Sequence, residues 1–376
     1  MSILKTIKKP YKIYGDVNTI EFGALQQFVD TMNQPSVTYG ALMPDVHQGY
    51  TVPIGCVFNS KGIIFPSAVG MDIGCGCCAI ATTFDAQEIY NNAQKIYDAL
   101  MGCIPVGFNH RGTVHPLYKD TCHNLTAQMQ KIYKEKQGWS HCSSLGSGNH
   151  FLEIGVDETD GVWIIIHSGS RGVGHGCAEY YMKLASPTGK ASEDFFGFDV
   201  NSKNGQDYIN DMTWCLEFAL QNRKLMMYDT IKVIESIGIT GGIGTTFINR
   251  NHNHAESKDG INWIHRKGAT HAEDGMMGVV PGNMKDGSFI VRGLGNPESL
   301  CSSSHGAGRV MGRGKAKKVL DEEVFRDMMV GIIANVGEST LDESPMAYKD
   351  IYTVMDDQKD LVDIIAHVKP ILNVKG

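Results

Sequence analysis

The sequence predicts a mixed α/β protein in which central β-sheets are flanked by helices and polar clusters sit on loops at strand ends. Strand-like apolar runs alternate with segments of helical periodicity. The helical segments are fewer and less regularly placed than a doubly wound parallel sheet requires. No low-complexity linker and no solenoid repeat divides the 376 residues, so we expect one compact domain over residues 1–376.

The best-defined predicted strand–helix pair lies in the first third of the chain. Residues 76–84 form an apolar run typical of a buried strand. Asp85 and Glu88 then offer a capping box for a helix. Apolar residues follow at helical spacing, at Ile89, Ala93, Ile96, Tyr97 and Leu100.

Later segments repeat these patterns. Residues 161–166 read as a strand that ends at His167, and residues 206–237 read as a long helix with Met212, Leu216, Ala219 and Leu220 on one side. Further short strands are predicted at residues 261–264 and 288–291, and a helix at residues 309–320.

The amino-acid composition limits the class of protein to which this chain can belong. The chain is 42% hydrophobic and 20% charged, which is ordinary for a globular protein. It has no apolar stretch long enough for a bilayer and no apolar run behind its first lysines, so we expect a soluble, cytoplasmic protein. The 10 cysteines show no regular spacing, which argues against a disulfide framework or a zinc finger.

Charge argues against broad electrostatic binding to nucleic acid, because the formal net charge is −7. A local basic groove remains compatible with this balance. A dense positive run lies beside His305, but charge alone favours a solvated helix face. Its members are Arg309, Arg313, Lys315, Lys317 and Lys318.

Two clusters in the first half of the chain carry candidate metal ligands. Asp72 and Cys75 lie three residues apart on a glycine-rich turn, where a carboxylate and a thiolate can reach one divalent ion. The alternative is a turn with a buried structural cysteine. Asn149 and His150 are adjacent, with Glu153 three residues further on, and a core histidine is an equally good interpretation of this cluster.

Two more histidine clusters follow. His167 ends an apolar strand and precedes a glycine-rich loop, whose backbone N–H groups can hold phosphate. His252 begins the run His-Asn-His, for which a surface loop is the simpler interpretation. Arg266 and Lys267 form either an anion site or a solvated basic turn.

The cluster from His305 to Arg309 suggests covalent chemistry. An imidazole can form a phosphoramidate and so store a nucleotidyl group. The small residues after His305 let phosphate approach the backbone, and Arg309 can neutralise its charge. The alternative is a helix N-terminus capped by residues 302–304, with His305 uninvolved.

Taken together, the clusters favour a metal-dependent transfer reaction. One aspartate, one cysteine and three histidines form a nitrogen, sulfur and oxygen set that suits manganese, zinc, iron or cobalt better than magnesium or calcium. A separate histidine beside a phosphate-compatible loop then indicates phosphoryl or nucleotidyl transfer.

These residues resemble the RtcB RNA ligases, and the resemblance runs nearly end to end. The matching stretches are residues 44–50, 70–76, 145–153, 167–171, 252–253, 266–269, 281–284, 295–298, 304–309, 347–349 and 374–376. Several of these motifs are long and specific.

The resemblance implies a GTP- and manganese-dependent ligase for RNA repair or tRNA splicing. It would join an RNA 3′-phosphate or 2′,3′-cyclic phosphate end to a 5′-hydroxyl end, the cyclic phosphate being hydrolysed first. By position, His305 is the expected nucleophile that takes GMP from GTP and passes it to RNA as RNA(3′)pp(5′)G. The expected ligands of a two-manganese site are Asp72, Cys75, His150, His167 and His252.

The resemblance also implies a guanylate pocket, in which Glu153 and Lys375 suit hydrogen bonding to guanine. The expected pocket residues are Asn149, His150, Phe151, Leu152, Glu153, His252, Asn253, Pro281, Gly282, Asn283, Met284, Ser288, His305, Gly306, Ala307, Gly308 and Lys375.

Departures from the family pattern are modest. Cys77 and Cys78 stand where an aliphatic residue is more frequent, Asn283 where serine is frequent, and Ser168 in place of threonine. The chain is also somewhat short for the family. It resembles an accessory bacterial branch devoted to RNA repair, which is compatible with an activating or repair partner protein.

Two other functions use the same residues. A metal-dependent phosphoesterase would need the five ligands but no covalent step at His305. A binding module for RNA ends or translation factors that has lost turnover would need neither, and the complete ligand set argues against it.

Overall fold

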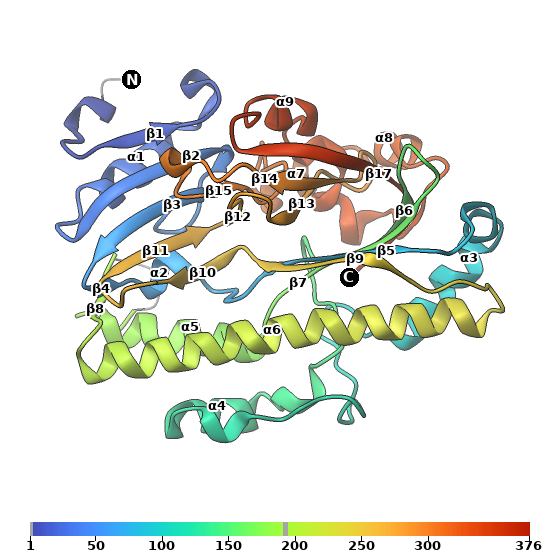
Figure 1. Ribbon diagram of the computed structural model, residues 1–376, viewed down its shortest axis with the longest axis horizontal. Helices are drawn as coiled ribbons and strands as arrows, with labels where there is room; N and C mark the ends of the chain where they lie inside the picture. The colour runs from blue at the N-terminus through green and yellow to red at the C-terminus, as the bar shows by residue number, and fades with distance from the viewer. Residues whose placement is uncertain (1–2, 191–194) are drawn as a thin grey trace.

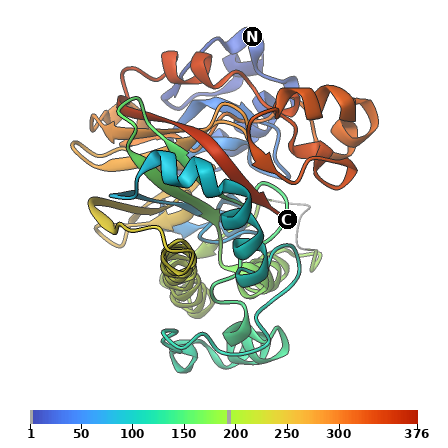
Figure 2. The ribbon, with the colours of Figure 1, turned by 90° about the vertical axis from the view of Figure 1, so that its right-hand side faces the viewer.

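The computed structural model describes residues 3–190 and 195–376. Within these residues, the strands form two large sheets and two small ones (Figure 1). The long helices lie along one side of both large sheets. Figure 2, turned by 90°, shows the yellow-green helix α6 below the sheets and the segment around α4 further out on the same side.

The larger sheet is mainly antiparallel. In the described residues its strand order is β13 (Met277–Pro281), β14 (Ser288–Gly293), β17 (Val362–Lys375), β6 (Phe151–Val156), β7 (Val162–Ser168), β5 (Gly76–Thr82) and β9 (Ile243–Asn251), with β16 (Ile333–Ala334) parallel to β17.

The second large sheet contains the N-terminal strands. Its order is β1 (Tyr11–Ile13), β2 (Val37–His47), β3 (Ile54–Lys61), β11 (Asn262–Lys267) and β10 (Asn253–Glu256). Two short pairs complete the strands of the described chain. They are β4 (Ile63–Ile64) with β8 (Phe198–Asp199), and β12 (Ala269–His271) with β15 (Ser302–Ser304).

The helices differ greatly in length. The α-helices in the described residues are α1 (Phe22–Met32), α2 (Pro66–Val69), α3 (Ala86–Cys103), α4 (Ala127–Glu135), α5 (Arg171–Ala185), α6 (Lys203–Ser236), α7 (Arg313–Val319), α8 (Glu322–Met328) and α9 (Ile351–Asp356). Helix α6 has 34 residues and therefore spans about 51 Å, long enough to pass beneath both sheets. None of the described helices is long and apolar enough to cross a membrane.

Strand alternation in β5 divides two apolar cores, because successive side chains point to opposite faces. Cys78 and Ile80 pack with residues of α3 and α6 on one face. Cys77 and Ala79 pack on the other face with residues of β7, β9, β13, β14 and β17. A third core lies between α1 and the second sheet.

Most elements predicted from the sequence are present with shifted ends. The predicted strand at 76–84 is β5, and Asp85 caps α3 by accepting a hydrogen bond from the backbone N of Glu88 at 2.9 Å. The expected apolar positions of α3 are buried, apart from a half-buried Tyr97. The strands at 161–166, 261–264 and 288–291 are β7, β11 and β14, and the long helix is α6.

The predicted helix at 309–320 is wrong in its first four residues, and its capping by residues 302–304 is wrong. Ser302–Ser304 form strand β15, and α7 begins only at Arg313. Gly308 has a φ of +74°, which a right-handed helix cannot contain. An added Cβ there would lie 2.2 Å from the carbonyl oxygen of Asp45, so the loop needs glycine for close backbone approach.

Candidate active site

A pocket is lined by residues of both large sheets. Its wall includes His47 at the end of β2 and Lys267 at the end of β11. On the other side are Phe151 of β6, His167 of β7 and Lys375 of β17. The polar clusters predicted at strand ends therefore meet at one place.

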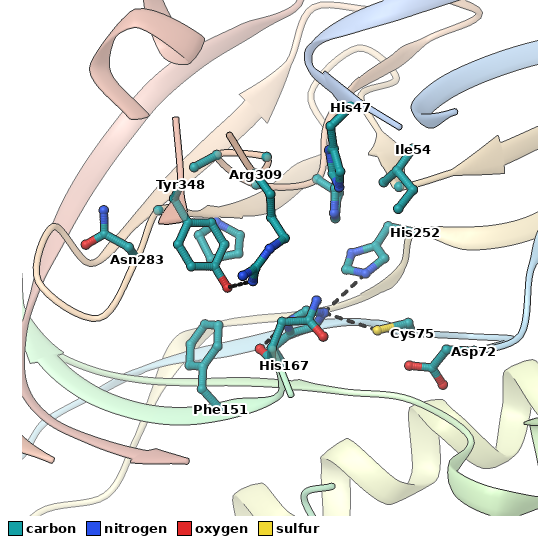
Figure 3. A pocket seen from close by; sticks show the side chains of 18 of the residues that line it. His47, Ile54, Asp72, Cys75, Phe151, His167, His252, Asn283, Arg309 and Tyr348 are labelled. Atoms are coloured by element: carbon teal, nitrogen blue, oxygen red, sulfur yellow. Dashed lines mark hydrogen bonds between the residues drawn. The ribbon is translucent and has the colours of Figure 1, made fainter. Parts of the chain in front are cut away.

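Three buried side chains converge in the middle of the pocket (Figure 3). The Nε2 atom of His167 lies 3.1 Å from Sγ of Cys75 and 3.2 Å from Nε2 of His252. Nδ1 of His167 donates to the carbonyl oxygen of Asn149 at 3.1 Å, which leaves the lone pair on Nε2. The three ligand atoms can hold one metal ion.

A second group shares the same cysteine. Nε2 of His150 lies 2.9 Å from Oδ2 of Asp72 and 3.4 Å from Sγ of Cys75. Asp72, Cys75 and His150 are the second set of ligand atoms close enough to hold an ion. The arrangement suits two neighbouring metal ions that share Cys75.

Burial controls the protonation of these groups. It lowers the pKa of His167 and His252 well below the usual range, so both imidazoles are neutral and can coordinate a cation. Burial also raises the pKa of the Cys75 thiol well above its usual range, so a thiolate needs a nearby cation. Burial would also raise the pKa of Asp72, but hydrogen bonding to His150 outweighs burial and lowers this pKa to about 2.

Helix α6 fixes the three strand ends that carry Cys75, His167 and His252. Arg223 of α6 is fully buried and donates from Nη1 to the carbonyl oxygens of Gly74 at 2.9 Å and Ser168 at 2.7 Å. Its Nε and Nη2 donate to two asparagines of β9, each at 2.7 Å. One guanidinium therefore ties β5, β7 and β9 together beside the ligands.

His305 lies beside the metal-ligand cluster and has a carboxylate partner. Its ring centroid is 4.8 Å from that of His252. Nδ1 of His305 donates to Oδ2 of the fully buried Asp45 at 2.6 Å. This hydrogen bond places the proton on Nδ1 and leaves Nε2 with the lone pair a nucleophile needs.

A buried carboxyl group lies on β6 in the wall of the pocket. Glu153 accepts hydrogen bonds from the hydroxyl of Ser288 at 3.1 Å and from the amide of Asn373 at 3.2 Å. Burial raises the pKa of Glu153 to about 7 in spite of these contacts. Its charge is therefore sensitive to conditions near neutral pH.

A second buried carboxylate, Glu343, organises four groups that line the pocket. It accepts from Lys375 at 2.8 Å, from the hydroxyl of Tyr348 at 2.5 Å, from Arg309 at 3.2 Å and from Arg313. Burial would raise the pKa of Glu343, but Lys375 and Arg313 outweigh it and lower the pKa to about 2. The carboxylate stays ionised and holds three cations in place.

Comparison with known proteins decides the family. The family model described as tRNA-splicing ligase RtcB matches residues 27–141 and 119–376. The chain belongs to the RtcB family. It is 35% identical to the RNA-splicing ligase RtcB of Escherichia coli K12, over 100% of this chain and 99% of that protein.

More distant RtcB proteins also match over nearly their whole length. RNA-splicing ligase RtcB2 of Escherichia coli ATCC 25922 is 27% identical, over 97% of this chain and 95% of that protein. The tRNA-splicing ligase RtcB of Thermococcus kodakarensis is 25% identical, over 99% of this chain and 96% of that protein.

The structure brings together all five side chains expected as metal ligands, with His305 beside them. Most residues expected around the guanylate also line the pocket. They are Asn149, Phe151, Glu153, His252, Asn253, Pro281, Gly282, Asn283, Met284, Ser288, His305, Gly306, Ala307, Gly308 and Lys375.

Two expected guanylate residues lie elsewhere. Leu152 is fully buried in the core shared with α3 and α6, because it points away from the face of β6 that carries Phe151 and Glu153. His150 contacts Asp72 and Cys75, so its side chain belongs to the metal-ligand cluster and not to the pocket lining.

Two simpler interpretations are wrong: the surface loop at His252 and the solvated basic turn at Arg266 and Lys267. His252 is 3% exposed and so does not lie on a surface loop. Arg266 is 1% exposed and is held by Glu256 and Ser302, so residues 266–267 are not a solvated turn. Lys267 is also buried and lines the pocket.

No sequence pattern predicts a role for Asp45, Tyr348 or Glu343. Asp45 and Tyr348 lie inside matching stretches of the family, at residues 44–50 and 347–349, which is the signal that could have marked them. No local pattern pairs Asp45 with His305, because 260 residues separate them.

Proposed function

We propose that this protein is a GTP- and manganese-dependent RNA ligase with His305 as its nucleophile. It joins a 3′-phosphate or 2′,3′-cyclic phosphate end to a 5′-hydroxyl end, in RNA repair or tRNA splicing in the cytoplasm. The Asp45–His305 pair beside the cluster of five ligands carries this proposal. The names of the RtcB relatives support RNA ligation.

The first step is transfer of GMP to His305. Nε2 attacks the α-phosphorus of GTP, a P–N bond forms, and the bond to the β-phosphate breaks with loss of pyrophosphate. The imidazole becomes positively charged as this bond forms. Asp45, fully buried and hydrogen-bonded to Nδ1, stabilises that charge and keeps the ring oriented.

The ligand cluster fits manganese, since neutral imidazoles, a thiolate and a carboxylate form a suitable donor set. When bound, two manganese ions supply charge neutralisation and alignment of the triphosphate for in-line attack. The five side chains would hold these ions close to His305, whose ring lies 4.8 Å from that of His252 between centroids.

Guanine selection follows from the two buried charged groups of the pocket. An ionised Glu153 accepts hydrogen bonds from the N–H groups of guanine, and Lys375 donates to its carbonyl oxygen. Adenine presents the opposite pattern at these positions. Glu343 keeps Lys375 in place for this contact.

The remaining steps pass GMP to RNA. An oxygen of the RNA 3′-phosphate attacks the guanylate phosphorus, the P–N bond breaks, and His305 is released. The 5′-hydroxyl then attacks the RNA phosphorus of RNA(3′)pp(5′)G, loses its proton, and GMP leaves. A cyclic phosphate end is first opened by water to a 3′-phosphate.

An assay with two labelled RNA strands tests this function. Strands ending in 3′-phosphate and 5′-hydroxyl are expected to be joined with GTP and Mn²⁺, and not with ATP or without metal. Exchange of His305 for alanine should abolish joining. Retained opening of a cyclic phosphate by that variant would show that the metal cluster works without the covalent step, whereas joining by it would overturn the proposal.

A further inference from the structure

The pocket has two ends, and the proposed guanylate occupies one of them. Figure 3 shows Asn283 on the left and His47, Ile54 and His252 together on the right, with Tyr348 and Arg309 between the two sides. Phe151 lies on the side away from His47 in Figure 3, and Nζ of Lys375 lies 5.7 Å from the centroid of the Phe151 ring, so the proposed guanine contact is away from the His47 end. An RNA end that reacts at His305 needs a place at that opposite end.

Tyr50 lies at this end of the pocket and is unusually exposed. It follows His47 by three residues in the loop between β2 and β3, lines the pocket, and has 83% of its surface exposed. An aromatic ring exposed at a pocket that binds RNA offers a face on which a base can stack.

The backbone that carries Tyr50 is fixed in spite of this exposure. Nε2 of Gln27 in α1 donates to the carbonyl oxygens of Gly49 at 2.8 Å and Tyr50 at 3.0 Å. The backbone N of Gly49 donates to Oε1 of Gln27 at 3.0 Å. The Tyr50 ring therefore projects from a loop whose backbone is fixed by hydrogen bonds to Gln27.

Neighbouring groups suit a nucleotide. Nδ1 of His47 donates to the carbonyl oxygen of Asp45 at 2.9 Å, which leaves Nε2 as an acceptor for a hydroxyl group. Burial lowers the pKa of His47 to about 4, so this acceptor persists at neutral pH. Lys267 adds positive charge to the lining, which complements phosphate.

We propose that Tyr50 is the stacking platform for the terminal base of the RNA strand that reacts at His305. This inference rests on the proposed ligase function and names its RNA subsite. Bases of every kind stack on an aromatic face, so the site holds RNA ends with little sequence preference.

The test combines a protein variant with a change in the RNA. The probe is a short single-stranded RNA with a 3′-phosphate, with either an ordinary or an abasic terminal nucleotide. Wild-type protein is expected to bind the ordinary RNA roughly 5- to 150-fold more tightly than the abasic one, the range for one stacked base. Y50A should lose most of that preference, and Y50F should keep it.

Tyr90 supplies the matched control, because it is 49% exposed on α3 away from the pocket. Y90A is expected to bind both RNAs as the wild type does. An unchanged base preference in Y50A, or a loss in Y50F equal to that in Y50A, would overturn the RNA subsite.

Adduct formation separates this failure from failure of the ligase itself. The His305–GMP adduct needs no RNA, so it is measured on the same samples. Absence of the adduct in wild-type protein would count against the proposed function, whereas its presence with an unchanged base preference in Y50A would count against the subsite alone. Loss of the adduct in Y50A would show a structural role and also reject the subsite.

Discussion

The carboxylate of Asp45 accepts two hydrogen bonds from His305. Nδ1 of the imidazole donates to Oδ2 at 2.6 Å, and the backbone N of the same residue donates to that oxygen at 3.1 Å. The double contact fixes both the ring and the start of its loop. It also directs Nε2 away from Asp45, as nucleophilic attack on a phosphate requires.

Replacing Asp45 by asparagine should slow formation of the GMP adduct by roughly 10²- to 10⁴-fold, because a neutral amide stabilises the charged imidazole poorly. Single-turnover labelling with GTP measures this rate. Asp30→Asn, on the exposed side of α1, is the matched control and should react normally. Normal labelling of the Asp45 variant would remove this residue from the mechanism.

Cys75 belongs to both ligand groups, so Cys75→Ala should weaken both metal sites. We expect a loss of at least about 100-fold in manganese affinity, measured by calorimetric titration of metal-stripped protein. Asp72→Ala and His252→Ala should each weaken mainly one site. Cys77→Ala, at a buried cysteine two residues away, should bind manganese normally. Normal manganese binding by the Cys75 variant would show that Cys75 is not a ligand.

We expect the affinity for GTP to depend on pH through the ionisation of Glu153. Burial raises its pKa to about 7, and only the ionised form offers both carboxyl oxygens as acceptors for the proposed contact with the N–H groups of guanine. GTP affinity should therefore fall about tenfold for each pH unit below 7, and Glu153→Gln should bind GTP weakly at every pH. Nucleotide titrations on both sides of pH 7 measure this effect.

The raised pKa of Glu153 also makes the stability of the fold depend on pH. A carboxyl group whose pKa is higher in the folded than in the unfolded state binds its proton more tightly when folded. Its contribution to stability is therefore lost as pH rises from about 4.5 to about 7. Glu153→Gln should raise the melting temperature above pH 7, and an unchanged or lower value would contradict the raised pKa.

Arg223 should matter for both stability and metal binding. Arg223→Met removes donors from two buried carbonyl groups and two asparagines, each worth roughly 1–3 kcal/mol when left unsatisfied. We expect a clear loss of thermal stability together with weaker manganese binding. Lys224→Met, at the next and exposed position of α6, should change neither.

Local sequence patterns predicted those helices and strands that are determined by neighbouring residues. The apolar run of β5 and the Asp85 cap of α3 follow from neighbouring residues, and both are present. The helix predicted from residue 309 begins only at Arg313, because Arg309 forms a β-bridge with Tyr348 and the backbone N of Val310 donates to the carbonyl oxygen of Ala347.

Sequence motifs predicted which residues form the candidate site, but not which distant residues contact them. Each candidate ligand stands in a recognisable stretch of sequence, yet the contacts of Asp45, Arg223 and Glu343 join segments far apart in the chain. Leu152 shows a second limit of such motifs. Side chains alternate along a strand, so a motif on a strand that lines a pocket also includes residues, such as Leu152, that face the core. Only the register of β6 against its neighbours decides which side chains reach the pocket.

The most direct measurement is mass spectrometry of the protein after incubation with GTP and Mn²⁺. We expect a single added guanylate on His305, stable in alkali and labile in acid, as a phosphoramidate should be. Unmodified His305 in protein that has bound manganese, or a guanylate attached to another residue, would contradict this expectation.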